Sequence, residues 1–139
     1  MNYFVGIDIG GTNVEIGILN AQGDILGKES IKTESKKGAE DTFNRIWNKT
    51  KELAEKLKIK VEDIEAIGLG IPGPVVNNSV VKIAANFSWN NDFPAKALME
   101  KISGKPVKVG NDVKLIALGE ALFGAGRGYK NSITIPIGT

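Results

Sequence analysis

The sequence predicts an α/β domain with a mixed sheet that starts as an antiparallel meander of three strands, with helices packed on the sheet. Three observations support this fold class. Residues 3–32 contain short runs in which apolar and other residues alternate, separated by turn residues. After Gly38 the apolar residues recur every three or four positions, as in a helix. Beyond that helix, strand-like and helix-like segments alternate, which indicates helices against a sheet.

The first three strands are expected at residues 3–9, 14–19 and 25–32. In the second strand, apolar residues alternate with Glu15 and Gly17, so the strand has two distinct faces. Residues 10–12 (Gly-Gly-Thr) and the turn cluster at residues 20–24 make the two connections. Connections this short join neighbouring antiparallel strands, which gives the meander.

One amphipathic helix of about five turns is expected after Gly38, because Lys and Glu separate its apolar residues. The run at residues 64–75 is almost continuously apolar and ends in a Gly/Pro loop, which indicates a strand buried on both faces in mid-sheet. Asp92 is expected to cap a short helix that has Pro94 in its first turn and ends near Gly104. The other expected elements are a hairpin, a strand, a mostly apolar and therefore buried helix, a loop and a last strand, at residues 75–81, 105–110, 113–123, 124–131 and 132–137.

Composition excludes several classes of function. The 139 residues are 42% hydrophobic and 24% charged, as in ordinary globular domains. The 18 basic residues form no concentrated stripe, so no nucleic-acid partner is expected. No apolar run is long enough to span a membrane and no signal-peptide pattern is present, so we expect a cytoplasmic protein. Without Cys or His, proton transfer near neutral pH must use a carboxylate, Lys, Tyr or water.

Residues 68–73 match the dinucleotide-binding pattern G-x-G-x-x-G after a strand, and Asp92 follows at about the right distance. That pattern must open a helix whose N-terminus faces the pyrophosphate. Here Pro72 and Pro74 bracket the last glycine, and Pro74 pushes Gly73 away from helical geometry. We therefore interpret residues 68–73 as a strand and loop. A Walker-type phosphate loop is absent from the sequence.

Asp8, Gly10, Gly11 and Thr12 are the first candidate site. They fit a tight hairpin whose glycines take positive φ. They also fit a phosphate site, because bare glycines let backbone N–H groups approach phosphate oxygens and Thr12 adds a hydroxyl donor. Asp8 would repel a phosphate directly, so it would act through a hydrated Mg²⁺ ion.

Asn111 and Asp112 are the second candidate site, between a strand and a helix. Asn and Asp are good helix caps, yet open α/β sheets also bind ligands at the carboxyl ends of their strands. Asp112 could there accept a proton from a substrate hydroxyl. Glu120 is expected to be structural, and the loop containing Arg127 to be a flexible connector.

Five segments, FVGIDIGGTNVEIGIL, GLGIPGPV, AANFSWNNDFP, VGNDVKLIALGEALFGAGRG and SITIPIGT, together resemble the N-terminal lobe of the ROK family (repressor, open reading frame, kinase). The resemblance covers essentially the whole chain in the right order. It implies a ribonuclease-H-like, actin-like ATPase fold, in which two lobes close around ATP and a sugar. Residues 1–139 would form the N-terminal lobe, with the C-terminal lobe absent and with any zinc site in that absent lobe.

The resemblance also implies roles for single residues. Asp8, Gly10, Gly11 and Thr12 match the first phosphate motif, in which Asp8 holds Mg²⁺ through water, and Gly138 and Thr139 match the start of the second. Asp112 matches the catalytic base, and the positions that contact sugar hydroxyls are Gly73, Asn86, Asn111 and Asp112. Lys114 departs from the family pattern, because it puts a flexible cation where an amide is typical, so sugar preference or helix packing could differ.

By this resemblance, the whole protein is expected to be an ATP-dependent hexose kinase of the glucokinase type, acting on the 6-hydroxyl as a homodimer. Glucose, mannose, fructose and two N-acetylhexosamines all fit as substrates. The chain ends in mid-motif, so we expect it to be a fragment that is inactive alone. The alternatives are a non-catalytic sugar-binding lobe and the sugar-sensing domain of a ROK repressor. Against the repressor, Asp112 is retained and the first strand begins at Tyr3, leaving no room for a DNA-binding helix-turn-helix.

Overall fold

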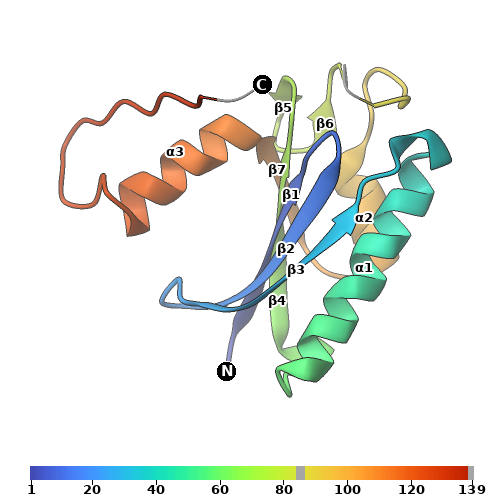
Figure 1. Ribbon diagram of the computed structural model, residues 1–139, viewed down its shortest axis with the longest axis horizontal. Helices are drawn as coiled ribbons and strands as arrows, with labels where there is room; N and C mark the ends of the chain where they lie inside the picture. Colours follow the sequence, from blue (N-terminus) through green and yellow to red (C-terminus); the bar gives the residue numbers. More distant parts are fainter. Residues whose placement is uncertain (84–86, 138–139) are drawn as a thin grey trace.

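The computed structural model describes residues 1–83 and 87–137, with a five-stranded sheet at its centre (Figure 1). The sheet has the order β3-β2-β1-β4-β7. Its strands are β1 (Tyr3–Ile9), β2 (Asn13–Asn20), β3 (Ile25–Lys32), β4 (Ile64–Ile71) and β7 (Val107–Asn111). A separate hairpin is formed by β5 (Val75–Val76) and β6 (Val80–Val81). The helices are α1 (Ala39–Lys56), α2 (Ala95–Ser103) and α3 (Asp112–Phe123), and the 3₁₀ turns are η1 (Ser35–Lys37) and η2 (Val61–Asp63).

The pairing of the strands confirms the predicted mixed sheet. β1, β2 and β3 pair antiparallel, as the short connections between them require. β4 pairs parallel to β1, and β7 pairs parallel to β4. Parallel neighbours need a crossover connection, and α1 and α2 occur in these two crossovers. The carboxyl ends of β1, β4 and β7 consequently lie at one edge of the sheet.

The hydrophobic core lies on one face of the sheet, under α1 and α2, whereas α3 lies on the other side (Figure 1). Every second residue of the central strands points into this core, as a two-residue period requires. The buried hydrophobic residues of the five-stranded sheet are Val5, Ile7, Ile9, Val14, Ile16, Ile18, Ile64, Ile67, Leu69, Ile71, Val107 and Val109. Helix α1 adds its predicted apolar stripe, including the fully buried Phe43 and Ile46.

The opposite face, which we call the open face, consists largely of glycine. Gly6 of β1 pairs with Gly17 of β2 on one side and with Gly68 of β4 on the other, so three glycines form a row. The end of β4 at Ile71, before the Gly/Pro loop, is as predicted, but the prediction that this strand is buried on both faces is wrong, because Gly68 is exposed. The prediction failed because glycine was counted as part of the apolar run, although glycine has no side chain that burial could remove from water.

Helix α3 begins one residue earlier than predicted, at Asp112, and ends at Phe123 as predicted, but the prediction that it is buried is wrong. None of its residues is buried, and Leu118, Leu122 and Phe123 are more than half exposed. The apolar residues of α3 surround the helix, whereas Leu115 approaches the sheet glycines Gly70 and Gly110, and Leu115 and Ile116 line the cavity beside the sheet. No helix in the described residues combines the length and apolarity needed to cross a bilayer.

The predicted last strand is also wrong, since residues 132–137 adopt no regular structure. Ile133 and Ile137 are exposed by 91% and 95%. A strand requires a neighbour that accepts its hydrogen bonds, and Pro136 lacks a backbone N–H to donate. Within the described residues, no backbone hydrogen bond outside the regular elements involves residues 132–137.

The start of α2 differs from the prediction as well. The N-cap is Pro94, not Asp92, and no side chain caps the helix. Phe93 and Val81 exchange backbone hydrogen bonds in an isolated bridge, which holds Phe93 extended and delays the helix to Ala95. Asp92 has a positive φ of 56° and instead forms an ion pair with Lys82. The C-terminus of α2 is as predicted, because Gly104 follows it in the left-handed region.

Candidate active site

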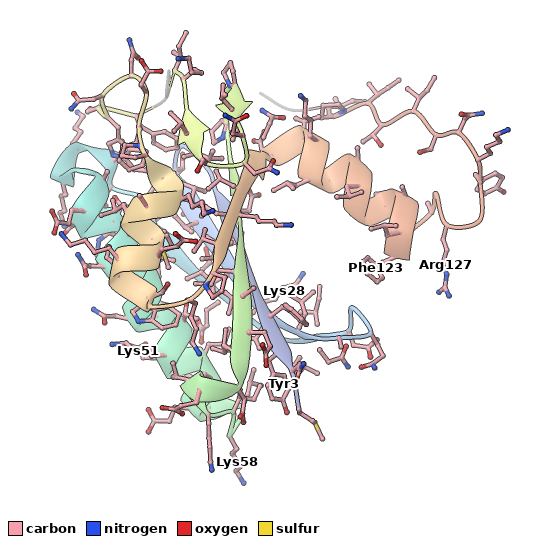
Figure 2. All side chains as sticks on the ribbon, turned by 180° about the vertical axis from the view of Figure 1, so that it is seen from behind. Tyr3, Lys28, Lys51, Lys58, Phe123 and Arg127 are labelled. Atoms are coloured by element: carbon pink, nitrogen blue, oxygen red, sulfur yellow. The ribbon has the colours of Figure 1, made fainter. Side chains whose placement is uncertain are left out.

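A cavity of about 540 Å³ lies between α3 and the open face of the sheet. Asp8 lines it from near the carboxyl end of β1, and Asp112 lines it from the first position of α3, directly after β7. Phe123, at the other end of α3, lies against the β2–β3 turn, where a Cβ on Gly23 would be 2.8 Å from the Phe123 ring (Figure 2). Helix α3 thus crosses the open face, and the two predicted acids share one hollow.

The acid end of the cavity carries three carboxylates. Glu15 is the direct cross-strand neighbour of Asp8 and accepts a hydrogen bond of 2.7 Å from the Ser30 hydroxyl. Partial burial raises the pKa of Asp8 above its usual range, and the charges of Asp112 and Glu15 raise it further. Among the described residues, Asp8 forms no ion pair. This end of the cavity therefore favours a bound cation.

Residues 10–12, which we call the glycine turn, join β1 to β2 beside Asp8. The expectation of positive φ is wrong, because neither Gly10 nor Gly11 is among the glycines with positive φ. Gly10 is instead required by close approach: its N–H donates to the Asn13 carbonyl at 2.9 Å, and a Cβ would lie 2.8 Å from that oxygen. Within the described residues, no hydrogen bond uses the N–H of Gly11 or the N–H and hydroxyl of Thr12. These donors are available to an anion.

Gly73 and Asn111 meet at the same edge of the sheet. Gly73 has a φ of 111°, and a Cβ there would lie only 2.4 Å from the Ile83 carbonyl oxygen. The Asn111 side-chain amide donates to the Gly73 carbonyl at 3.0 Å, and its oxygen accepts from the Lys114 N–H at 3.3 Å. Asn111 is thus the N-cap of α3, as predicted, and it also connects the helix to the loop after β4.

One oxygen of the Asp112 carboxylate is held and the other is available. Asp112 Oδ1 accepts a hydrogen bond of 2.8 Å from the N–H of Val113. No hydrogen bond within the described residues engages the other oxygen. A carboxylate with a fixed orientation and one available lone pair, facing a cavity, can accept a proton from a bound hydroxyl.

The remaining predicted residues divide into two groups. Asn86, Gly138 and Thr139 lie outside the described residues. Glu120 has a structural role, as predicted. Its carboxylate accepts a hydrogen bond of 2.9 Å from the Ala125 N–H, which lies just beyond the C-terminus of α3.

Sequence reasoning did not identify three residues at or behind the site. Glu15 and Lys28 line the cavity, and Thr33 contacts the glycine turn from behind. Glu15 could have been found, since the alternation of a hairpin places it on the same face as Asp8. The contact of Thr33 follows from the register of β3 against β2, and its burial depends on how α1 packs on the sheet, which local spacing does not reveal.

The residues present fit a magnesium phosphate group. In residues 1–83 and 87–137, no three Asp, Glu, His or Cys side chains come together as a metal site. Mg²⁺, however, typically binds to one or two carboxylates, water and substrate phosphates. Asp8 offers one such carboxylate in the cavity, and the available donors of the glycine turn suit phosphate oxygens.

Comparison with known proteins identifies a family match over nearly the whole chain. The family model described as "ROK family" matches residues 4–139. A glucokinase of Halalkalibacterium halodurans is 38% identical over 99% of the chain and 42% of its own length. A glucokinase of Thermotoga maritima is 34% identical over 97% of the chain and 41% of its own length. The chain thus spans about two fifths of the length of these relatives.

The fold comparison agrees with the sequence comparison. A crystal structure of a ROK family glucokinase from Streptomyces griseus, in complex with glucose and AMPPNP, matches 91% of the chain with a TM-score of 0.80 and 33% sequence identity. The match covers 38% of that glucokinase. The predicted ribonuclease-H-like, actin-like fold class is therefore confirmed.

Proposed function

The chain belongs to the ROK family, and from that premise we propose that residues 1–139 are the N-terminal lobe of a two-lobed sugar kinase. The whole protein transfers the γ-phosphoryl group of ATP to the 6-hydroxyl of a hexose. The observation that supports this proposal most strongly is the shared cavity of Asp8 and Asp112, with Asp8 beside the glycine turn and Asp112 at the start of α3. Phosphoryl transfer needs such positioning and charge neutralisation more than covalent chemistry.

On the phosphate side, the N–H groups of Gly11 and Thr12 and the Thr12 hydroxyl donate to phosphate oxygens. Gly10 allows the tight turn that aims these groups. Asp8 would hold Mg²⁺ through water, and the ion would supply positive charge that neutralises the phosphates. We propose, from the family motif, that Gly138 and Thr139 add a second set of phosphate donors.

On the sugar side, Asp112 accepts the proton of the 6-hydroxyl through its available oxygen. The sugar oxygen bonds to the γ-phosphorus as the bond from that phosphorus to ADP breaks. Asn111 has used one N–H on Gly73 and retains a second N–H for a sugar hydroxyl. Asn86 and Gly73 complete the proposed sugar contacts. Such a site rejects sugars that would leave its polar groups unpaired.

The proposal includes the setting of the whole protein. We propose that it acts in the cytoplasm as a homodimer, and that any zinc site lies in the C-terminal lobe. Light scattering of the full-length protein measures the predicted dimer directly. Zinc analysis of the full-length protein, compared with the 139-residue chain, locates any metal.

An ADP-release assay with the full-length protein tests the proposed reaction on glucose, mannose, fructose, N-acetylglucosamine and N-acetylmannosamine. We expect turnover with at least one of them, and negligible turnover by the 139-residue chain. Asp112→Asn should lower kcat about 10²- to 10⁴-fold, because general base catalysis contributes about that much. The KM for ATP should change little, since Asp112 lies on the sugar side.

Asp63→Asn is the matched control, because η2 precedes β4 and so lies at the opposite edge of the sheet. It should keep the wild-type kcat. A full-length protein that binds a sugar but phosphorylates none would favour the repressor or the non-catalytic lobe. An Asp112→Asn variant with undiminished kcat would rule out Asp112 as the base.

A further inference from the structure

Thr33 is a fully buried polar residue directly after β3, and it contacts the glycine turn from behind. Its hydroxyl donates to the Gly10 carbonyl at 2.7 Å. Its backbone N–H donates to the Thr12 carbonyl at 2.9 Å. One residue therefore holds both ends of the turn that carries the proposed phosphate donors.

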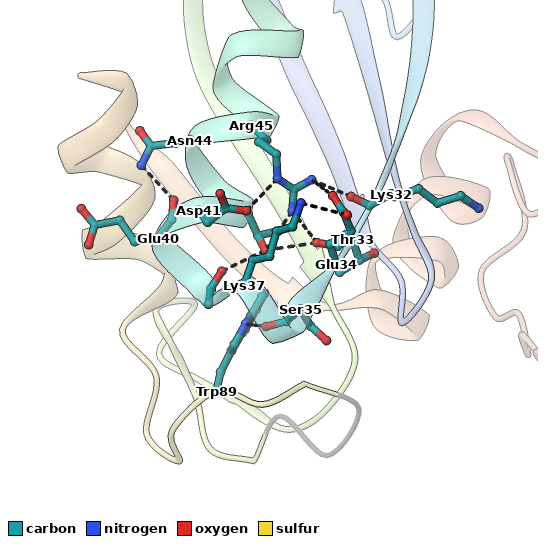
Figure 3. Close-up of polar contacts among 12 residues, drawn as sticks. Lys32, Thr33, Glu34, Ser35, Lys37, Glu40, Asp41, Asn44, Arg45 and Trp89 are labelled. Atoms are coloured by element: carbon teal, nitrogen blue, oxygen red, sulfur yellow. Dashed lines mark hydrogen bonds and ion pairs between the residues drawn. The ribbon is translucent and has the colours of Figure 1, made fainter.

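Helix α1 in turn holds Thr33 in place (Figure 3). The Thr33 carbonyl accepts two hydrogen bonds, one of 2.6 Å from Arg45 Nη2 and one of 3.2 Å from the Thr42 hydroxyl. Arg45 Nη1 donates to the Lys32 carbonyl at 2.6 Å, and Nε donates to Asp41 at 2.8 Å. Since a guanidinium group is planar, these three hydrogen bonds fix its orientation. The position of Thr33 is therefore set from two sides, by the pairing of β3 with β2 and by helix α1.

The hydroxyl of Thr33 has a directional effect on the turn. In a trans peptide unit, the C=O of one residue and the N–H of the next point in opposite directions. The Gly10 carbonyl points at Thr33, so the Gly11 N–H must point away from Thr33 and from the interior. Donors that are oriented before binding cost less entropy when the ligand arrives.

We propose that Thr33 is a positioning residue that orients the peptide between Gly10 and Gly11, so that the Gly11 N–H is presented to a nucleotide phosphate. This inference rests on the proposed function. Thr33 itself lies behind the turn and is fully buried, so it acts on the nucleotide only through the turn. The Thr33 hydroxyl, more than the volume of the side chain, orients the peptide between Gly10 and Gly11.

The test compares Thr33→Val, which removes the hydroxyl at nearly constant volume, with Thr33→Ser, which retains it. Calorimetry on the full-length protein measures the affinity for Mg-AMPPNP and, separately, for the sugar. Thr33→Val should weaken nucleotide binding about five- to tenfold, as loss of one buried hydrogen bond predicts. Thr33→Ser should stay within about twofold of wild type, and neither variant should change the sugar affinity.

Thr50→Val is the matched control. Thr50 is as fully buried as Thr33 but lies on α1, and its hydroxyl donates to the Ile46 carbonyl of the same helix at 2.8 Å. It should leave nucleotide binding unchanged. The inference is overturned if Thr33→Val binds the nucleotide like wild type, if Thr50→Val weakens it equally, or if nucleotide and sugar affinities fall together.

A wild-type protein that binds no nucleotide would contradict the proposed function instead of the role of Thr33. In that case ¹⁵N relaxation of the Gly11 amide still decides the inference. The amide should be more mobile in Thr33→Val than in wild type, and unchanged in Thr50→Val. Equal Gly11 mobility in all three proteins would overturn it.

Discussion

Replacing Gly73 by Ala tests whether the loop after β4 is shaped by close packing at the sugar side of the site. Gly73 has a φ of 111°, which L-residues rarely adopt. An added Cβ would lie 2.4 Å from the Ile83 carbonyl oxygen, so the backbone must move. The Gly73 carbonyl also accepts the Asn111 amide at 3.0 Å, and that bond would be strained or lost.

The expected magnitude has two parts. Backbone strain at such a φ costs about 1–3 kcal/mol, and the lost hydrogen bond costs about 1 kcal/mol. Gly38→Ala supplies a matched control, because Gly38 has a φ of 95° but a Cβ there meets nothing within 4 Å. Gly38→Ala should show the strain alone. We therefore expect Gly73→Ala to lower the free energy of unfolding by at least about 1 kcal/mol more than Gly38→Ala does.

Urea denaturation of the 139-residue chain measures this difference, with the buried Trp47 and Trp89 as fluorescence reporters. The slopes of the denaturation curves must agree between variants for the comparison to hold. In the full-length protein, Gly73→Ala should raise the KM for the sugar more than the KM for ATP. A Gly73→Ala variant no less stable than Gly38→Ala would refute the close-packing argument.

Two further predictions concern the two faces of the sheet. The pKa of Asp8 is raised in the folded chain by burial, Asp112 and Glu15, so the wild type loses stability as pH rises through that pKa. Asp8→Asn should therefore raise the urea midpoint at about pH 7 and much less at about pH 3; an equal rise at both pH values would contradict this. On the core face, Phe43→Ala should lower the free energy of unfolding by about 3–5 kcal/mol, because Phe43 is fully buried. Phe123→Ala, at 62% exposure, should cost far less in the same urea experiment.

The local part of the fold could be predicted from the sequence. Alternation identified the strands now seen as β1 and β2, the turn cluster before Ile25 indicated where β3 begins, and helical spacing identified α1. Three of the failures, at α3, the last strand and Asp92, occur where the outcome depends on a partner distant in the sequence. The spacing of α3 indicated an apolar helix correctly, but burial requires a second surface on every apolar side. Asp92 had the right chemistry for a cap, yet the pairing of Phe93 with Val81 moved the helix start.

The candidate site was predictable only where topology places residues at a common edge. Asp8 and Asp112 each lie near the carboxyl end of a strand, and parallel pairing through β4 brings those ends together. Thr33 could not be found in this way. It looks like an ordinary polar residue after an exposed strand, and its burial arises from Arg45 and Thr42 on a helix packed behind it.

The glycines of the open face explain how a small sheet can carry acids beside a helix. In the row that holds Asp8, its neighbour on β4 is Gly70, and the next position on β7 is Gly110. A Cβ on Gly70 would lie 3.6 Å from the Asp8 carboxylate and 3.4 Å from Leu115. A Cβ on Gly110 would lie 2.8 Å from Leu115.

A Cβ at Gly110 would displace the Leu115 side chain of α3, and a side chain longer than a methyl group at Gly70 would crowd Leu115 and the Asp8 carboxylate. The bare positions leave room for the Asp8 carboxylate and let α3 approach until Asp112 lines the same cavity. The same positions contribute no apolar side chain to a core, so burial must come from the opposite face, where α1 and α2 pack. Separation of stability and chemistry onto two faces of one sheet is thus a consequence of where the glycines lie.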